Sequence, residues 1–206
     1  MSSQRVFITG TDTGVGKTLI SAWLCTHWAS HYWKPIQSGL DDTTDSQWVH
    51  TLSGVHTWPE RHRLAAPLSP HQSAAREGVD IQLSDFEYPA GDRLLIEGAG
   101  GCVVPLNWQH TMLDLMAHLQ APVLLVARST LGTINHTCLS LQALRARGIP
   151  VLGVVLSGPA NPENLRSIEH FGQTRVLGQL PWLDTVSREA LLAHPLPQPL
   201  LQALNA

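Results

Sequence analysis

The stretch Val6-Phe7-Ile8-Thr9-Gly10-Thr11-Asp12-Thr13-Gly14-Val15-Gly16-Lys17-Thr18 decides the fold of this chain. It opens with a short apolar run, typical of a buried strand, and continues with three glycines and a Gly-Lys-Thr triplet. A glycine-rich loop between a strand and a helix wraps phosphates with its backbone N–H groups, at the positive end of the helix. We therefore predict a phosphate-binding loop that leads into a helix over residues 19–29.

The loop departs from the GxxxxGK[ST] pattern at one position. The first glycine of the pattern should stand at position 11, where this chain has Thr11, with Gly10 one place earlier. The strand before the loop and the helix after it still favour phosphate binding over a chance triplet in a surface turn. In such loops the lysine reaches the outer phosphates and the hydroxyl binds Mg²⁺. These roles fall to Lys17 and Thr18.

Composition predicts one globular domain over residues 1–206 and excludes several classes of protein. Of the 206 residues 43% are hydrophobic and 14% charged, which is not the balance of a disordered chain. The formal net charge is −3, and no cluster of Lys and Arg indicates a nucleic-acid surface. The apolar runs are too short to span a bilayer, and residues 1–5 show no signal-peptide pattern. Three widely spaced cysteines indicate reduced thiols. We expect a cytoplasmic protein that binds neither nucleic acid nor membrane.

Four nearly continuous apolar runs indicate strands that are covered on both faces. They span residues 6–9, 94–96, 123–127 and 151–156, and helical patterns over 113–119 and 135–147 lie between them. This alternation predicts a three-layer α/β domain of the phosphate-loop NTPase type, with a mostly parallel sheet.

Two other regions interrupt this alternation. Residues 39–91 form a loop-rich excursion with short helices expected over 45–52 and 70–77, and we expect it to carry substrate-binding groups. Residues 187–204 are expected to form a helix that is broken by prolines.

A second chemical motif, Leu94-Leu95-Ile96-Glu97-Gly98-Ala99-Gly100-Gly101, reads as a strand that ends at an acid and then turns. In phosphate-loop proteins a carboxylate on a neighbouring strand helps to hold Mg²⁺. The glycines would let the backbone approach a ligand closely. The alternative is an ordinary turn at the end of a strand.

A third motif places Lys34 where a second strand should begin, within Tyr32-Trp33-Lys34-Pro35-Ile36-Gln37-Ser38-Gly39. There the lysine would lie near a transferred phosphate, whereas the alternative is a solvated lysine on an edge strand. An acidic group follows at Asp41, Asp42 and Asp45. It is either a solvated loop or the source of one metal ligand.

Taken together, these motifs resemble the dethiobiotin synthetase family. The resemblance rests on the phosphate loop, 34–39, Pro67-Leu68-Ser69-Pro70-His71, Glu97–Gly101, Gly132-Thr133-Ile134-Asn135-His136 and Pro181-Trp182-Leu183. That family has a homodimeric phosphate-loop fold. It converts 7,8-diaminononanoate, CO₂ (in equilibrium with bicarbonate) and ATP into dethiobiotin, ADP and phosphate, with Mg²⁺.

The resemblance implies a role for each matching residue. Catalytic roles fall to Lys34, Lys17 and Thr11, and substrate contacts to Thr11, Ser38, Gly132 and Asn135, the last two across a dimer interface. The nucleotide would contact Gly14, Val15, Gly16, Lys17, Thr18, Leu19, Glu97, Gly98, Ala99, Gly100, Pro181, Trp182 and Leu183. Mg²⁺ would bind Thr18, Asp45 and Glu97.

Departures from the family pattern keep other interpretations open. The segment before Lys34 is compressed, so the second strand should be short or shifted. The family's Asn-Asp after the strand at 151–156 is Ser157-Gly158 here, which predicts weaker discrimination between ATP and other nucleoside triphosphates. One alternative is a switch ATPase of the partitioning type, although such proteins carry a lysine where this chain has Asp12. Another is a degenerate paralogue that binds nucleotide without turnover.

Overall fold

The computed structural model describes residues 4–28 and 31–206. Its centre is a seven-stranded sheet with the order β4-β2-β6-β1-β7-β8-β9, in which every strand pairing is parallel. The strands are β1 (Gln4–Gly10), β2 (His31–Trp33), β4 (Thr57–Trp58), β6 (Arg93–Gly101), β7 (Val123–Arg128), β8 (Val151–Ser157) and β9 (Val176–Leu180). The predicted parallel sheet is therefore confirmed.

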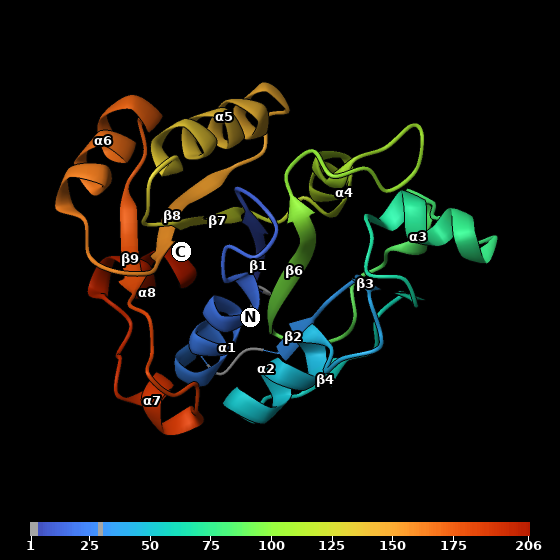
Figure 1. Ribbon diagram of the computed structural model, residues 1–206, viewed down its shortest axis with the longest axis horizontal. Helices are drawn as coiled ribbons and strands as arrows, with labels where there is room; N and C mark the ends of the chain where they lie inside the picture. The colour runs from blue at the N-terminus through green and yellow to red at the C-terminus, as the bar shows by residue number, and fades with distance from the viewer. Residues whose placement is uncertain (1–3, 29–30) are drawn as a thin grey trace.

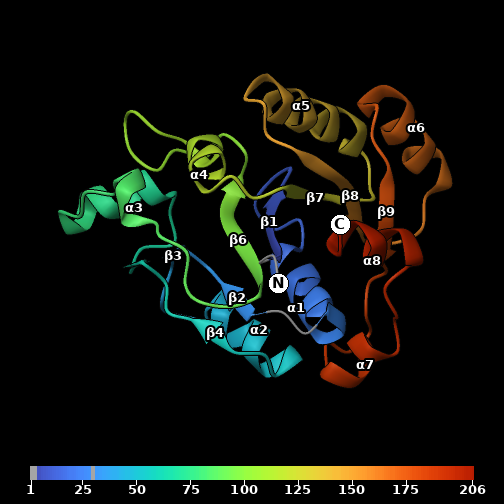
Figure 2. The same cartoon turned by 180° about the vertical axis from the view of Figure 1, so that it is seen from behind.

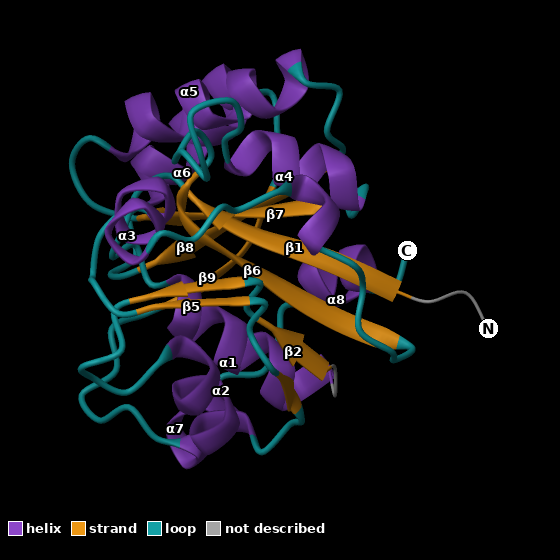
Figure 3. Ribbon diagram, turned by 90° about the vertical axis from the view of Figure 1, so that its right-hand side faces the viewer, coloured by secondary structure: helices purple, strands orange, loops and turns teal. Residues whose placement is uncertain are grey.

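Helices cover both faces of this sheet, as Figure 3 shows from the side. One face carries α4 (Met112–Leu119), α5 (Thr133–Ala146) and α6 (Pro162–Gly172), and the other carries α1 (Lys17–Trp28), α2 (Asp45–Ser53), α7 (Arg188–Leu192) and α8 (Gln198–Leu204). Phe7 packs into the first core and its neighbour Ile8 into the second, and both are fully buried. Because successive side chains enter opposite cores, the strands read as continuous apolar runs. The predicted three layers are confirmed.

The second strand is short, as the compressed segment predicted. β2 ends at Trp33, and β3 (Ile36–Ser38) then pairs with β5 (His62–Leu64) in a separate two-stranded sheet. Lys34 and Pro35 connect them, and the Pro35 carbonyl accepts hydrogen bonds from the N–H groups of Arg61 and His62. The backbone between β2 and β3 therefore carries Lys34 away from the central sheet's ladder.

The region 39–91 holds more regular structure than we predicted. Helices α2 and α3 (Pro70–Glu77) lie where expected, but β4, β5 and the short 3₁₀ turn Leu83–Asp85 were not expected. Strands of two or three residues are too short to show a period. Figures 1 and 2 place α3 at one end of the molecule and α6 at the opposite end, so this region extends the fold on one side of β6.

The prediction that the sixth strand ends at Glu97 was wrong. β6 continues to Gly101, with Glu97 opposite Ile8 and Gly101 opposite Gly10, across an irregularity in β1 between Ile8 and Gly10. Gly101 pairs with Gly10, where two residues without side chains let the backbones lie close together. Glu97 thus projects from inside the sheet.

Elements in the second half of the chain partly match expectation. Helices α4 and α5 lie within a residue or two of their predicted bounds, and the C-terminal segment splits into α7 and α8 around prolines. Helix α6 and strand β9 were not predicted. The first helix was expected to reach Ala29, which lies outside the described residues. In the part of the chain that is described, no helix combines the length and the apolar character needed to cross a membrane.

Candidate active site

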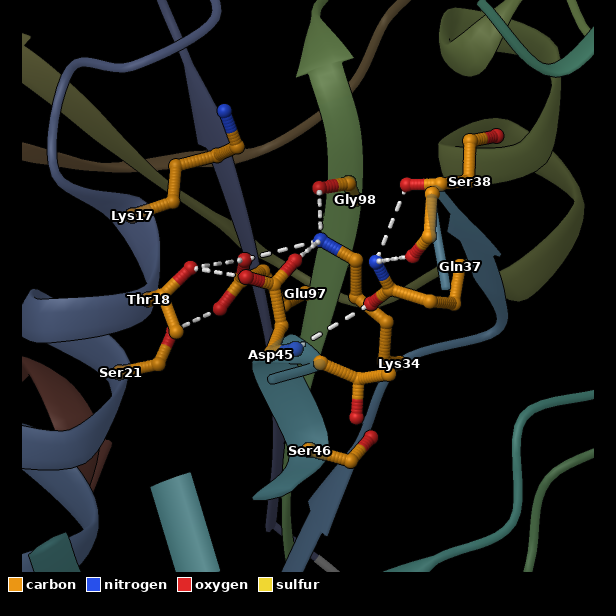
Figure 4. A network of polar contacts seen from close by, with 12 residues as sticks. Lys17, Thr18, Ser21, Lys34, Gln37, Ser38, Asp45, Ser46, Glu97 and Gly98 are labelled. Atoms are coloured by element: carbon orange, nitrogen blue, oxygen red, sulfur yellow. Dashed lines mark hydrogen bonds and ion pairs between the residues drawn. The ribbon is translucent and has the colours of Figure 1, made fainter. Parts of the chain in front are cut away.

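The phosphate loop closes the C-terminal end of β1 and passes directly into α1. Gly14 and Gly16 have φ values of 72° and 95°, a conformation that side chains rarely adopt. A Cβ at Gly16 would lie 2.7 Å from Ser157 Oγ at the end of β8, so glycine is also required for space. Lys17 begins α1, and its Nζ donates to the Asp12 carbonyl at 3.2 Å. The lysine therefore bends back over the loop, away from the carboxylates seen in Figure 4.

Glu97 is the centre of a buried polar cluster, drawn in Figure 4. Its carboxylate is fully buried and has a partner on every side. Oε1 lies 2.9 Å from Lys34 Nζ and 3.2 Å from Thr18 Oγ1, and Oε2 accepts from Ser21 Oγ at 2.7 Å and Tyr32 OH at 3.0 Å. A buried carboxylate must be hydrogen-bonded or paired to remain charged, and this one is both.

Asp45 reaches the same cluster from the first turn of α2. Thr44 and Gln47 form a capping box around it, and Gln37 Oε1 accepts from the Asp45 N–H at 3.3 Å. Oδ2 lies 2.6 Å from Lys34 Nζ, and Oδ1 lies 2.7 Å from Thr18 Oγ1. The position also favours negative charge, because the N-terminal end of a helix is its positive end.

Lys34 is held by three acceptors, one for each N–H of its ammonium group. Besides Asp45 and Glu97, the Gly98 carbonyl accepts from Nζ at 3.3 Å. Burial lowers the pKa of Lys34, but the carboxylates of Glu97 and Asp45 outweigh burial and raise it overall. Burial likewise opposes ionisation of Asp45, yet Lys34 holds the pKa of Asp45 below its ordinary value.

The pKa values of Lys17 and Tyr32, in and beside this cluster, shift mainly because of burial. Burial lowers the pKa of Lys17 from its ordinary value, and Glu97 only partly opposes this change. Burial, followed by the charge of Glu97, raises the pKa of Tyr32 well above its ordinary value. Lys17 and Lys34 are the only lysines in the sequence, and both are buried, Lys34 against the carboxylates and Lys17 over the phosphate loop. The chain thus places both of its ammonium side chains at one site.

A pocket of about 920 Å³ opens over this cluster. One side is polar and is formed by the phosphate loop, Lys34, Asp45 and Glu97. The lining also includes the apolar residues Ile36, Pro67, Leu68, Pro70, Ala99 and Val104. Gly39 fits against Pro67, with a Cβ–Cβ distance of 3.1 Å if a side chain were built on it. The pocket can hold a charged group beside an aliphatic one.

Most of the predicted site residues meet at this pocket. It is lined by Gly14, Gly16, Lys17, Thr18, Leu19, Lys34, Ser38, Asp45, Glu97, Ala99 and Gly100. Ser38 Oγ is buried there without a hydrogen-bond partner among the described residues. Of the three candidate aspartates, Asp45 joins the cluster, whereas Asp41 and Asp42 are exposed and outside the lining.

The other predicted residues lie elsewhere. Thr11 is half-buried, outside the lining, and its N–H donates to the Val126 carbonyl. Val15 is buried in the core, and Gly98 contributes only its carbonyl to Lys34. Gly132 precedes α5 and Asn135 is exposed on that helix. Pro181, Trp182 and Leu183 follow β9 outside the lining, with Trp182 72% exposed. The roles of these residues stay predictions.

Sequence reasoning missed three polar residues of the cluster, Ser21, Tyr32 and Gln37. Ser21 lies one turn after Lys17 on α1, so it faces the same way. Tyr32 stands on β2 opposite Leu95, two residues before Glu97 on the same face of the sheet. Two relations could have predicted Ser21 and Tyr32: the four-residue spacing of Ser21 from Lys17 on the helix, and the place of Tyr32 on the strand next to the one that carries Glu97.

The oxygen ligands at this site suit Mg²⁺. Thr18 Oγ1 lies within hydrogen-bond distance of both carboxylates, at Asp45 Oδ1 and at Glu97 Oε1. Over residues 4–28 and 31–206, no three or more His, Cys, Asp or Glu side chains gather as a self-sufficient metal site. Mg²⁺ in phosphate-transfer sites binds one or two carboxylates together with substrate phosphates, so two carboxylates and a hydroxyl are a fitting set.

Comparison with known proteins supports the same interpretation. Residues 4–190 match the AAA domain family. The ATP-dependent dethiobiotin synthetase BioD of Paramagnetospirillum magneticum is 50% identical over 194 residues, which cover 93% of this chain and 95% of that protein. The proteins of the same name from Rhodopseudomonas palustris and Lawsonia intracellularis are 49% and 45% identical, over 93% and 96% of this chain and 92% and 98% of their own lengths.

Among solved structures, the cell division ATPase MinD of Pyrococcus furiosus aligns with a TM-score of 0.55 at 15% identity. The alignment covers 92% of this chain and 88% of that chain. This likeness shows the phosphate-loop fold alone and does not favour a switch ATPase. The sequence identity to the synthetases, over nearly the whole of each chain, is the stronger finding. This chain belongs to the family of ATP-dependent dethiobiotin synthetases.

Proposed function

We propose that this chain closes the ureido ring of dethiobiotin from 7,8-diaminononanoate, CO₂ and ATP. One amine of the diamine attacks CO₂, forms an N–C bond and loses a proton, which gives a carbamate. A carbamate oxygen then attacks the γ-phosphorus of ATP, and ADP leaves as the P–O bond to it breaks. The second amine attacks the carbamate carbon, and phosphate and a proton leave as the ring closes.

The observation that carries this proposal is the pair of buried lysines on two sides of one pocket. The reaction brings a carbamate against a triphosphate, so both reactants are negative where they meet. Lys17 extends from the phosphate loop, and Lys34 faces it from the segment that leads to Ser38. Fixed cations in a water-poor site stabilise such charge without reorganising. Lys17 would contact the outer phosphates and Lys34 the transferred phosphate and the carbamate.

Mg²⁺ would be held by Thr18, Asp45 and Glu97, with substrate phosphates completing its ligands. When bound, it would neutralise phosphate charge and orient the γ-phosphate. Lys34 already bonds two of these three residues, so metal and lysine share one set of carboxylates. Asp45 and Glu97 would therefore align the metal and Lys34 relative to each other.

Ser38 and the apolar wall beside it suit the diamine. The Ser38 hydroxyl is a free polar group next to an aliphatic surface, which fits an amine or carbamate at the end of an alkyl chain. From the family resemblance, Thr11 would contact the same amine or carbamate. Gly132 and Asn135 of a second copy would bind the substrate carboxylate, and Pro181, Trp182 and Leu183 would line the base. We propose accordingly that the enzyme is a homodimer, and that it works in the cytoplasm.

One assay tests the proposal. Purified protein receives ATP, Mg²⁺, bicarbonate and 7,8-diaminononanoate, and phosphate release is followed together with dethiobiotin by mass spectrometry. We expect phosphate release to require both diamine and bicarbonate. Phosphate release that ignores the diamine would instead indicate a nucleotide switch, and nucleotide binding without any turnover would indicate a degenerate copy. Either result overturns the proposal.

A further inference from the structure

The two oxygens of Glu97 have different neighbours. Oε1 faces Thr18 and Lys34, on the pocket side. Oε2 accepts two hydroxyl donors, Ser21 at 2.7 Å and Tyr32 at 3.0 Å. Both donor residues are fully buried and neither lines the pocket. One oxygen of the carboxylate is therefore used by the protein interior, and the other is left for the site.

The backbone explains how the two hydroxyls converge on one atom. Tyr32 pairs with Leu95 across β2 and β6, and Glu97 projects from the same face two residues later. Ser21 comes from α1, which packs on that face. A carboxylate turns easily about its last side-chain bond, because this torsion has broad, two-fold wells. Two charge-assisted hydrogen bonds to one oxygen remove that freedom.

We propose that Ser21 and Tyr32 are positioning residues that fix Glu97 so that only Oε1 is presented to the cation and to Lys34. Glu97 then binds a divalent cation through a single oxygen, and the direction of that oxygen is set from α1 and β2. The inference rests on the proposed function for its kinetic consequences, but its binding consequences are independent of the diamine.

The test compares two hydroxyl deletions with matched controls. Tyr32→Phe and Ser21→Ala each remove one donor to Oε2. Tyr88→Phe is the control for the first, because the Tyr88 hydroxyl donates to the Leu119 carbonyl away from the site. Ser73→Ala is the control for the second, because the equally buried Ser73 hydroxyl donates to the Ala66 carbonyl. Each variant is characterised by thermal melting, by Mn²⁺ affinity and by steady-state kinetics.

Mn²⁺ binding in the presence of a non-hydrolysable ATP analogue, measured from the electron paramagnetic resonance of free Mn²⁺, is the decisive readout. Loss of a partner that orients a metal ligand commonly weakens metal affinity or activity by about 10- to 100-fold. We expect a decrease of this size in Mn²⁺ affinity and in kcat for Tyr32→Phe and Ser21→Ala, with KM for the diamine unchanged. Tyr88→Phe and Ser73→Ala should bind Mn²⁺ as the wild type does.

A lower melting temperature with wild-type Mn²⁺ affinity and kcat in both variants would show that the hydroxyls only stabilise the fold, and would overturn the proposal. If one variant fails to fold, the other decides the outcome. Wild-type protein without diamine-dependent turnover would refute the proposed function, whereas the Mn²⁺ measurement needs no diamine and would still decide the positioning role.

Discussion

Lys34 and Asp45 form an ion pair with 2.6 Å between Nζ and Oδ2, and Lys34 is only 3% exposed. Glu97 lies on the other side of the same ammonium group. Burying three charges together is costly, and the arrangement is stable only while each keeps its partners. Lys34 is thus the shared cation that compensates both carboxylates, and the predictions on Lys34, Asp45 and alkaline stability depend on it.

Replacing Lys34 should affect both activity and stability. Lys34→Ala removes a fixed cation from the reacting charges, which commonly costs about 10²–10³ in kcat. It also leaves Asp45 and Glu97 without their shared partner, and breaking a buried pair in this way costs about 3–5 kcal/mol in the free energy of unfolding. Urea unfolding and phosphate release measure the two effects. Arg61→Ala, which breaks the more exposed Arg61–Asp85 pair, should cost at most about 1 kcal/mol. Full activity in Lys34→Ala would refute the role given to this lysine.

Stability should fall on the acid side because of Asp45. Lys34 holds the pKa of Asp45 below its ordinary value of 3.8, although burial opposes this. A lowered folded-state pKa gives stability that is present above the unfolded value and lost as pH falls through the folded value. Unfolding free energies between pH 7 and 2 should therefore converge for wild type and Asp45→Asn. Asp80→Asn, at an exposed position, should run parallel to wild type.

On the alkaline side the contributions of the two lysines oppose each other. The carboxylates raise the folded-state pKa of Lys34 above 10.5 despite burial, so its stabilising contribution is present below 10.5 and lost as pH rises through that raised value. Burial lowers the pKa of Lys17, so its contribution has the opposite sign. Lys17→Met should therefore expose a steeper alkaline loss of stability than wild type shows, whereas an unchanged slope would contradict this account.

Nucleotide selectivity should be weak. Gly158 has φ of 119°, and a Cβ there would lie 2.7 Å from Ser129 Oγ and 3.1 Å from Trp182 Nε1, so no side chain at this position can reach a base. The Gly158 carbonyl is already bonded by Gln179. We expect kcat/KM for ATP, CTP and GTP to agree within about tenfold, because Gly158 offers no side chain that could distinguish the bases. A tenfold preference would need about 1.4 kcal/mol of differential contact with the base. A strong preference for ATP would contradict this expectation.

A charge at Leu131 should separate the proposed dimer. Leu131 is 99% exposed just before Gly132, and Leu139 and Phe171 are exposed on the neighbouring helices α5 and α6. Leu131→Asp should give monomers in light scattering and lower kcat/KM for the diamine, because Gly132 and Asn135 would no longer reach a second copy. Leu192→Asp, on the opposite face of the sheet, is the control. Dimers that persist in Leu131→Asp would place the interface elsewhere.

Burial on both faces explains which parts of the fold could be predicted. Residues 123–127 of β7 enter the two cores in alternation, so this part of the strand forms one continuous apolar run. β9 contains Gly178 and Gln179 within five residues, which breaks such a run. α6 fully buries only Ile168 and Gly172, with Leu165 packed beside them, so its apolar stripe is narrow and the helix was not predicted. These two elements are held by the strand and the helix that precede them, β8 and α5, through contacts that their own local sequences do not show.

The candidate site divides along similar lines. Lys17 and Thr18 belong to the phosphate-loop motif and Glu97 to a strand-end motif, and the arrangement common to phosphate-loop proteins, with the family resemblance, predicted that they would meet. The contact between Tyr32 and Glu97 depends on the register of β2 against β6, which no local pattern encodes. Glycines after Glu97 suggested a turn, but pairing with β1 extended the strand to Gly101. The local sequence pattern thus predicted the reactive groups better than the residues that hydrogen-bond to them and orient them.

The scarcity of lysine has a practical consequence for anyone handling this protein. Lys17 and Lys34 carry all the ε-amino groups of the sequence, and both border the pocket. Reagents that attach dyes, biotin or solid supports through lysine amines will therefore find no harmless lysine on the surface. Any ε-amine they do modify lies in the candidate active-site pocket. Attachment through a chain terminus is the appropriate chemistry, and acylation of the two ε-amines, mapped by mass spectrometry, reports how accessible the pocket is.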